Sequence, residues 1–181
     1  KIGFYPYMAS KILKIRSNKV RSPVSIEKIT SHIGDMNLLK LSKQDKSLKK
    51  EVEVYIRNKL NSSNYQSYIN DLYNAGEYNQ VIKISYIYKT NNHFKFPKGY
   101  EKIVKKYSEK YQVDPNLIYA LIREESLFDP KAKSWVGAKG LMQIMDNTAN
   151  MLDKELNIKS SIYNPDDNIN LGTHYIMKLM K

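Results

Sequence analysis

The sequence predicts an all-α protein. Apolar residues recur at intervals of three and four along most of the chain, which is the spacing of amphipathic helices. Strand-like alternation bounded by turn residues is hard to find. The 181 residues, of which 41% are hydrophobic and 27% charged, can bury one good core or two small ones. We therefore expect a globular protein built from helices in one or two units.

Helical spacing predicts four helices in the first half of the chain, over about residues 4–15, 44–60, 65–74 and 78–88. Gly76 follows the third of these and suits a left-handed C-cap. The segment over residues 90–97 is polar and ends in proline, which interrupts a helix. We place a domain junction there, with a helical linker over residues 1–96 and a second domain over residues 97–181.

The second domain is predicted to hold four more helices. The first has one apolar face, made by Tyr100, Ile103, Val104, Tyr107 and Tyr111. The second has the clearest start, because Asp114 is a good N-cap residue and Pro115 takes the first helical position, where its missing N–H costs nothing. We expect it to end at about Leu127. A loop with glycines at residues 133–140 follows, and the last two helices cover about residues 147–156 and 167–180.

Two adjacent glutamates, Glu124 and Glu125, fall within or beside the apolar stripe of the second of these helices. Burial raises the pKa of a carboxyl, and a general acid needs a raised pKa to hold a proton near neutral pH. The spacing predicts such an acid but does not choose between the two residues. The alternative is that one or both lie at the helix end, paired with Arg123 or a lysine. Asp129, directly before Pro130, is interpreted as a turn residue.

Three motifs follow one another in the second domain: Glu125-Ser126, then Ser134 through Met145 (SWVGAKGLMQIM), then Asn168 through Gly172 (NINLG). Their order and spacing resemble the goose-lysozyme-like domain of soluble lytic transglycosylases. The resemblance implies a lysozyme-like α-helical catalytic domain, preceded in residues 1–96 by the last helices of an α-superhelix. In that family a further segment after the third motif closes the groove. The catalytic domain here is therefore expected to be partial. We expect the chain to be a fragment of a longer protein, and the alternative is that the cleft is incomplete and the chain inactive alone.

The same resemblance implies an enzyme that cuts the glycan strands of bacterial peptidoglycan without consuming water. Glu125 would act first as acid and then as base, leaving 1,6-anhydromuramic ends. Residues expected beside the carboxyl or along the sugar-binding cleft are Ser126, Ser134, Gln143 and Met145. Met145 could instead pack in the core, and Trp135 could stack on a sugar or serve as an apolar lid.

Two rival interpretations keep the lysozyme-like shape. One is a hydrolytic muramidase of goose-lysozyme type that attacks the same bond with water. The other is a non-catalytic, peptidoglycan-binding helical module. The net charge of +12 suits the anionic polymers of a cell wall. Nucleic acid is not the expected partner, because the lysines are scattered and no nucleic-acid-binding motif accompanies them.

Composition also bears on metals, cofactors and location. The chain has no cysteine, and His32, His93 and His174 show no ligand spacing, so we expect neither a metal nor a cofactor. No apolar run approaches the roughly 20 residues of a membrane helix, so we expect no transmembrane segment. We expect an exported protein of the bacterial periplasm or cell envelope, with the signal peptide not present in this chain.

Overall fold

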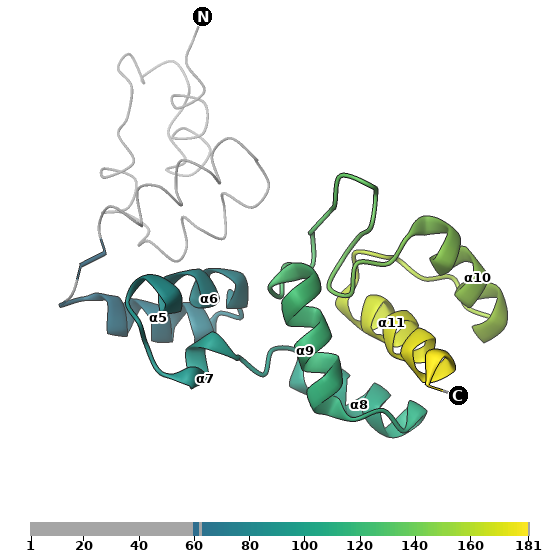
Figure 1. Ribbon diagram of the computed structural model, residues 1–181, viewed down its shortest axis with the longest axis horizontal. Coiled ribbons are helices and arrows are strands. Elements are labelled where there is room, and N and C mark those ends of the chain that lie inside the picture. Colours follow the sequence, from purple (N-terminus) through teal and green to yellow (C-terminus); the bar gives the residue numbers. More distant parts are fainter. Residues whose placement is uncertain (1–59, 62, 181) are drawn as a thin grey trace, which may run out of the picture. The chain divides into compact units, whose positions relative to one another are not determined.

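The computed structural model describes residues 60–61 and 63–180, and their regular structure is helical. The helices are α5 (Tyr65–Asn74), α6 (Tyr78–Ile87), α7 (Asn92–Lys95), α8 (Glu101–Tyr111), α9 (Pro115–Ser126), α10 (Asp146–Leu156) and α11 (Pro165–Leu179) (Figure 1). Within these residues no strand forms, and the loop between α9 and α10 holds two isolated bridges, Lys133 with Lys139 and Lys139 with Ile144. The all-α prediction is confirmed.

The chain divides into two compact units, Lys1–Asp71 and Leu72–Lys181. All predicted site residues lie in the second unit, which is described here. The helices expected over residues 4–15 and 44–60 fall outside the described residues, except for Leu60, which is not helical. A functional boundary between residues 96 and 97 stays a prediction.

The helices before the site follow the sequence prediction closely. Gly76 has a φ of +75°, as expected of a glycine after a helix. The short helix α7 was not predicted, because its segment is polar. It forms around Phe94, whose side chain is buried, so a single apolar anchor shapes a stretch that otherwise resembles a loop.

Side-chain caps fix the starts of the two helices that carry the motifs. The Asp114 carboxylate accepts the N–H of Asn116 at 2.8 Å, and Pro115 opens α9 as predicted. Helix α11 begins at Pro165, two residues earlier than predicted. Its start is set by Asn164, whose side-chain oxygen accepts the N–H groups of residues 166 and 167 at 2.9 and 3.3 Å.

The core of the second unit joins α6, α8, α9, α11 and the loop after α9. Helix α8 packs against both α9 and α11, and α10 packs against α11. The main cluster of buried side chains comprises Ile82, Val104, Tyr107, Val113, Ile118, Ile122, Phe128, Leu141 and Ile169. Two of these, Ile118 and Ile122, lie on α9. Burial of their apolar surface fixes the position of the helix that carries the adjacent glutamates in its last turn.

Candidate active site

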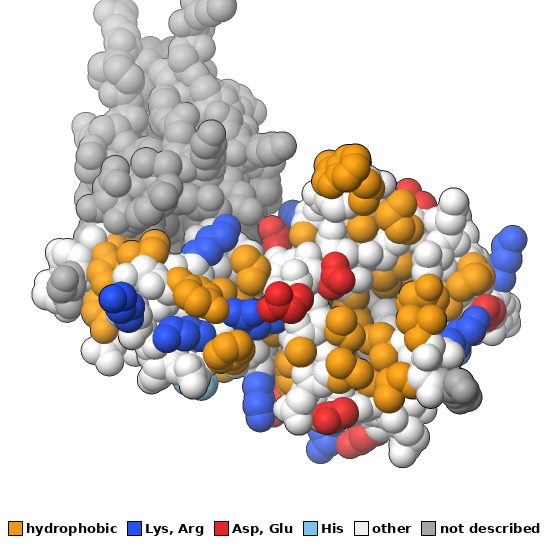
Figure 2. All heavy atoms as spheres, viewed as in Figure 1, with side chains coloured by type: hydrophobic (Ala, Val, Ile, Leu, Met, Phe, Trp, Pro, Cys, Tyr) orange, Lys and Arg blue, Asp and Glu red, His pale blue; other side chains and the backbone are white. Residues whose placement is uncertain are grey.

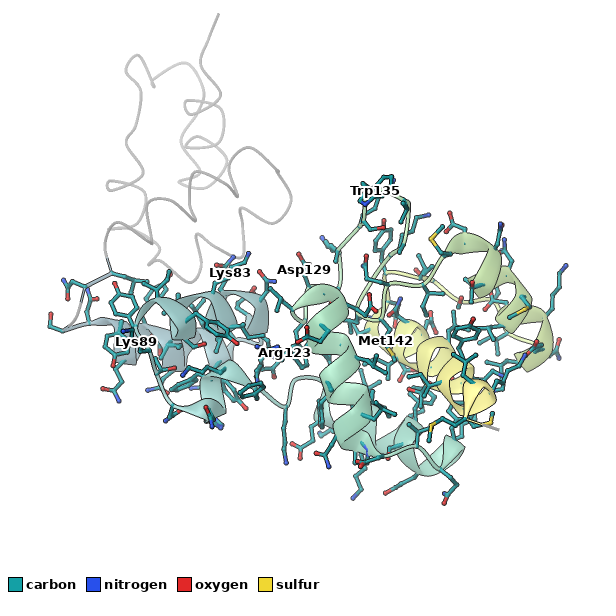
Figure 3. All side chains as sticks on the ribbon, in the orientation of Figure 1. Lys83, Lys89, Arg123, Asp129, Trp135 and Met142 are labelled. Carbon is teal, nitrogen blue, oxygen red and sulfur yellow. The ribbon has the colours of Figure 1, made fainter. Side chains whose placement is uncertain are left out.

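Arg123, in the last turn of α9, shows which of the two adjacent glutamates is free. Its guanidinium donates to the Glu124 carboxylate at 2.5 Å, to the Tyr86 hydroxyl at 2.5 Å and to the Lys95 carbonyl at 3.1 Å. Figure 3 shows Arg123 reaching from α9 toward α6 and α7. The pairing with Arg123 that the sequence left open therefore holds for Glu124 and not for Glu125.

Glu125 is exposed, and within the described part of the chain its carboxylate makes no hydrogen bond or ion pair. The expectation of a poorly solvated carboxyl in the apolar stripe is therefore wrong. The buried stripe is narrower than the sequence indicated, since Leu117 and Ala120 are also exposed. Glu125 lies in the last turn of α9, which ends at Ser126.

The turn after α9 is built by its own polar groups. Leu127 and Phe128 both have positive φ, of 49° and 62°, which reverses the chain. The Asp129 carboxylate accepts the N–H of Lys131 at 2.9 Å, so this residue acts in the turn as predicted. The Ser126 hydroxyl donates to the carbonyl of residue 122 at 2.9 Å within the helix. Ser126 thus lies beside Glu125 with its proton already engaged.

Ser134 closes the loop between α9 and α10. Its N–H donates to the Ala138 carbonyl at 2.9 Å, and its hydroxyl accepts the Ala138 N–H at 2.9 Å. The Gly137 N–H also donates to the Ser134 carbonyl, at 3.1 Å, and Gly137 has a φ of +98°. The hydroxyl proton of Ser134 has no acceptor among the described residues and stays available as a donor.

Gln143 supports the base of the same loop. Its amide nitrogen donates to the Gly140 carbonyl at 2.9 Å and to the Ala132 carbonyl at 3.3 Å. Its own backbone has a φ of 47°, an uncommon value for a residue other than glycine. The side-chain carbonyl of Gln143 has no partner in the described region, so its remaining polar function is that of an acceptor.

Asn168 was not singled out from the sequence, yet it ties the loop to α11. It is 1% exposed. Its amide nitrogen donates to the Lys139 carbonyl at 3.1 Å and to the Ile162 carbonyl at 2.8 Å, and its oxygen accepts the Met142 N–H at 2.8 Å. A buried amide requires hydrogen-bond partners, and these three bonds provide them.

The two apolar candidates of the loop both face solvent. Met145 is 42% exposed, so the core-packing alternative does not describe it. Trp135 is 97% exposed at the tip of the loop, where Figure 3 shows it projecting from the second unit. It therefore covers nothing in the described part of the molecule, and the lid interpretation is not supported.

A cavity of about 220 Å³ lies away from Glu125, between residues 96–98 and the face of α9 that carries Asn116, Tyr119 and Arg123. Burial raises the pKa of Tyr119 to about 12, with a smaller contribution from Glu101.

Among residues 60–61 and 63–180, no group of three or more histidine, aspartate or glutamate side chains is placed to hold a metal ion. Over the same residues no helix is long and apolar enough to cross a membrane.

Residues 102–181 match the family model described as the transglycosylase SLT domain. This matched region is called the SLT domain hereafter. The soluble lytic murein transglycosylase of Escherichia coli K12 is 38% identical over 87 residues, which are 45% of this chain and 14% of that protein. The membrane-bound lytic murein transglycosylase C of Serratia proteamaculans is 39% identical over 83 residues, which are 42% of this chain and 23% of that protein.

Solved structures agree on the fold. The crystal structure of the 70 kDa soluble lytic transglycosylase of Escherichia coli superposes with a TM-score of 0.69 and 24% identity. The match covers 98% of this chain and 31% of that protein. The same protein solved with bulgecin A gives the same values. The lysozyme-like, all-α fold expected from the sequence is confirmed for the SLT domain, and the chain spans less than a third of these relatives.

The SLT domain includes every predicted site residue. Glu125 and Ser126 lie at the end of α9, and Ser134, Gln143 and Met145 lie in the following loop or where it meets α10. Hydrogen bonds within the loop and to α11 fix the parts that carry Ser134 and Gln143. The domain therefore has a carboxylate without a partner among the described residues at the end of α9. The structured loop that follows in the chain offers a hydroxyl donor and an amide acceptor.

Proposed function

We propose that the SLT domain cleaves the β-1,4 bond between N-acetylmuramic acid and N-acetylglucosamine in peptidoglycan, with Glu125 as acid and then base. The observation that carries this proposal is the contrast at the end of α9. Glu124 is held by Arg123, whereas Glu125 is solvent-accessible and unpaired among the described residues. The relatives that match this region are lytic murein transglycosylases, which supports the same reaction here.

The proposed chemistry needs one carboxyl group and no water. Protonated Glu125 gives its proton to the glycosidic oxygen as the bond from that oxygen to the muramic C1 breaks. The muramic C6 hydroxyl then attacks C1 and loses its proton to the Glu125 carboxylate, which closes a 1,6-anhydro ring. The nucleophile belongs to the same sugar, so its effective concentration is high. The proton count balances, and the carboxyl is ready for another cycle.

Substrate binding has to supply the dry surroundings that the free domain does not give Glu125. A glycan strand lying across the end of α9 would displace water from the carboxylate. Loss of water disfavours the charged form of a carboxyl, so bound substrate would itself favour the protonated acid. This makes the acid effective only when a glycosidic bond is present beside it.

The residues of the loop would hold the sugars by neutral contacts. The Ser134 hydroxyl can donate to a sugar oxygen, and the Gln143 carbonyl can accept from a hydroxyl or acetamido N–H. Exposed Met145 offers an adaptable apolar surface. Ser126 would contribute through its place beside Glu125. Because peptidoglycan lies in the bacterial cell envelope, the proposal includes a location in the periplasm or cell envelope.

The deciding experiment compares Glu125→Gln with Glu124→Gln on purified sacculi. We expect Glu125→Gln to lose turnover by a factor of roughly 10³ or more while it still binds sacculi. Glu124→Gln should keep most of its activity, because Glu124 faces solvent and its partner Arg123 retains two other acceptors. If both variants cleave as well as the parent protein, Glu125 is not the acid.

Mass analysis of the released fragments separates the rival reactions. Transglycosylation leaves anhydromuramic ends that are lighter than hydrolysed ends by one water. Release of reducing muramic ends alone would identify a hydrolytic muramidase. Sacculus binding without any release of fragments by the parent protein would identify a non-catalytic binding module.

A further inference from the structure

Trp135 is the most exposed large apolar side chain in the described part of the protein. It is 97% exposed, and its neighbour Val136 is 52% exposed. No ring contact or hydrogen bond involves the indole within that part of the chain. Figure 2 shows apolar side chains projecting at the edge of the second unit where Figure 3 labels Trp135. So large an apolar surface left in water indicates a binding role.

The loop beneath Trp135 is rigidly built, which is unusual for a segment with nothing packed on its tip. Two hydrogen bonds join Ser134 and Ala138, and a third runs from the Gly137 N–H to the Ser134 carbonyl. Below them, Lys139 and Ile144 exchange backbone hydrogen bonds at 3.0 and 2.9 Å. These bonds hold the backbone on either side of Trp135, so binding to the indole would cost little loop ordering.

The loop that carries Trp135 is also the loop of the proposed sugar contacts. Ser134 precedes Trp135 directly, and Gln143 fastens the base of the loop. Two exposed lysines, Lys131 and Lys133, precede the loop tip in the chain. Neither forms an ion pair in the described region. Peptidoglycan combines pyranose rings with stem peptides that bear carboxylates. Its chemistry thus matches an aromatic surface beside unpaired cations.

We infer that Trp135 is a second anchoring point for the glycan strand, where the indole stacks on the C–H face of a pyranose ring some distance from the bond that is cut. The inference rests on the proposed function only for the identity of the strand. Lys131 and Lys133 attract the carboxylates of the stem peptides on the same strand. Trp135 is a binding and positioning residue and takes no part in proton transfer.

The chain contains one tryptophan and 15 tyrosines, so fluorescence excited at a wavelength that tyrosine does not absorb reports on Trp135 alone. The measurement uses the 181-residue chain with Glu125→Gln, so that cleavage does not alter the ligand. It is titrated with glycan strands freed of their stem peptides by an amidase. We expect a saturable shift of the emission to shorter wavelength, because stacking removes the indole from water. If the emission does not change at strand concentrations that saturate binding of the protein to glycan, the inference is overturned.

Co-sedimentation with intact sacculi gives the second readout. Trp135→Ala in the Glu125→Gln background should weaken binding by roughly tenfold, as is typical when a buried interface tryptophan is truncated. Trp135→Phe should recover part of that loss, since it keeps an aromatic face. Leu179→Ala, at the end of α11, is the matched control, because it removes an apolar side chain that is 69% exposed and lies outside the loop. It should change binding by less than about twofold. Equal binding by Trp135→Ala and the parent would contradict the proposal.

Vesicles of phosphatidylglycerol distinguish a lipid surface from a glycan. An exposed tryptophan with lysines can also enter the interface of an anionic membrane. An emission shift with vesicles and none with glycan strands would overturn the glycan assignment.

Failure of this inference can be distinguished from failure of the proposed function. If Glu125→Gln remained active, the acid would be misassigned, whereas the fluorescence titration would still support or refute stacking at Trp135.

Discussion

Gly140 lies directly against the side chain of Asn168, so close that a Cβ atom at position 140 would overlap the Asn168 amide nitrogen. Such an atom would also lie 2.6 Å from the backbone carbonyl oxygen of Ile162. Asn168 uses the same space to hold Lys139 and Met142 of the loop by hydrogen bonds. The glycine therefore permits the buried asparagine to connect the loop with α11.

Gly140→Ala is expected to lower the free energy of unfolding by about 2–4 kcal/mol, because it adds a collision with backbone to a φ of +76°. Gly137→Ala is the matched control. Gly137 also has a positive φ, of 98°, but a Cβ there would meet nothing within 4 Å. It should cost only about 1 kcal/mol, the strain of the left-handed backbone. Urea denaturation measures both, and equal losses would show that the Asn168 contact is unimportant.

Arg123 and Glu124 form an ion pair whose two members should differ in their effect on stability. The Arg123 side chain is 15% exposed and the Glu124 side chain 72%. Arg123→Met should cost about 2–3 kcal/mol, since the Lys95 carbonyl and the Tyr86 hydroxyl lose their donor. Glu124→Gln should change stability by less than about 0.5 kcal/mol. Similar losses in urea denaturation of the two variants would show that the exposed pair itself stabilises the fold.

The start of α9 illustrates what local sequence can predict. Asp114 and Pro115 act within one turn of each other, so no distant partner is needed to place the helix. The choice between Glu124 and Glu125 is different. It depends on where Arg123 points, and this is set by Tyr86 and Lys95, which are far away in the sequence. Helical periodicity carries no information about such contacts.

The loop shows the same division. Gly137 and Gly140 were expected to lie in a loop, and both lie there with positive φ. The structural roles of Gln143 and Asn168 were not expected, because a polar side chain in a sugar-binding motif can bond either to the ligand or to the backbone. In both residues the side-chain amide nitrogen donates to backbone carbonyls. The sequence identified the region but not how each polar atom is used.

Gln143 should therefore affect stability as well as substrate binding. Gln143→Ala leaves the carbonyls of Gly140 and Ala132 without their donor, and we expect a loss of about 1–2 kcal/mol. Met145→Ala is the comparison, because Met145 faces solvent and should cost less than about 1 kcal/mol. Thermal unfolding and sacculus binding, measured on both variants, test this. Undiminished stability of Gln143→Ala with weakened binding would assign Gln143 to the ligand alone.

Asp166, in the first turn of α11, makes the stability of the domain depend on acid pH. Desolvation acts to raise the pKa of its carboxyl, but hydrogen bonds from the Tyr107 hydroxyl at 2.5 Å and the Lys106 ammonium at 3.1 Å hold the pKa below the ordinary 3.8. A carboxyl with a lowered pKa in the folded state stabilises the fold fully above its unfolded pKa. That contribution is lost as the pH falls through the lower, folded pKa.

Asp166→Asn should reduce the free energy of unfolding at pH 7 by about 1 kcal/mol, a modest value because the side chain is 40% exposed and water screens its charge. The difference from the parent protein should shrink as the pH falls below 3.8, since the parent loses the charge that the variant never had. Tyr107→Phe should make the Asp166→Asn substitution less costly. Urea midpoints between pH 7 and pH 3 provide the measurement, and a difference that widens toward low pH would refute the role of the ionised carboxylate.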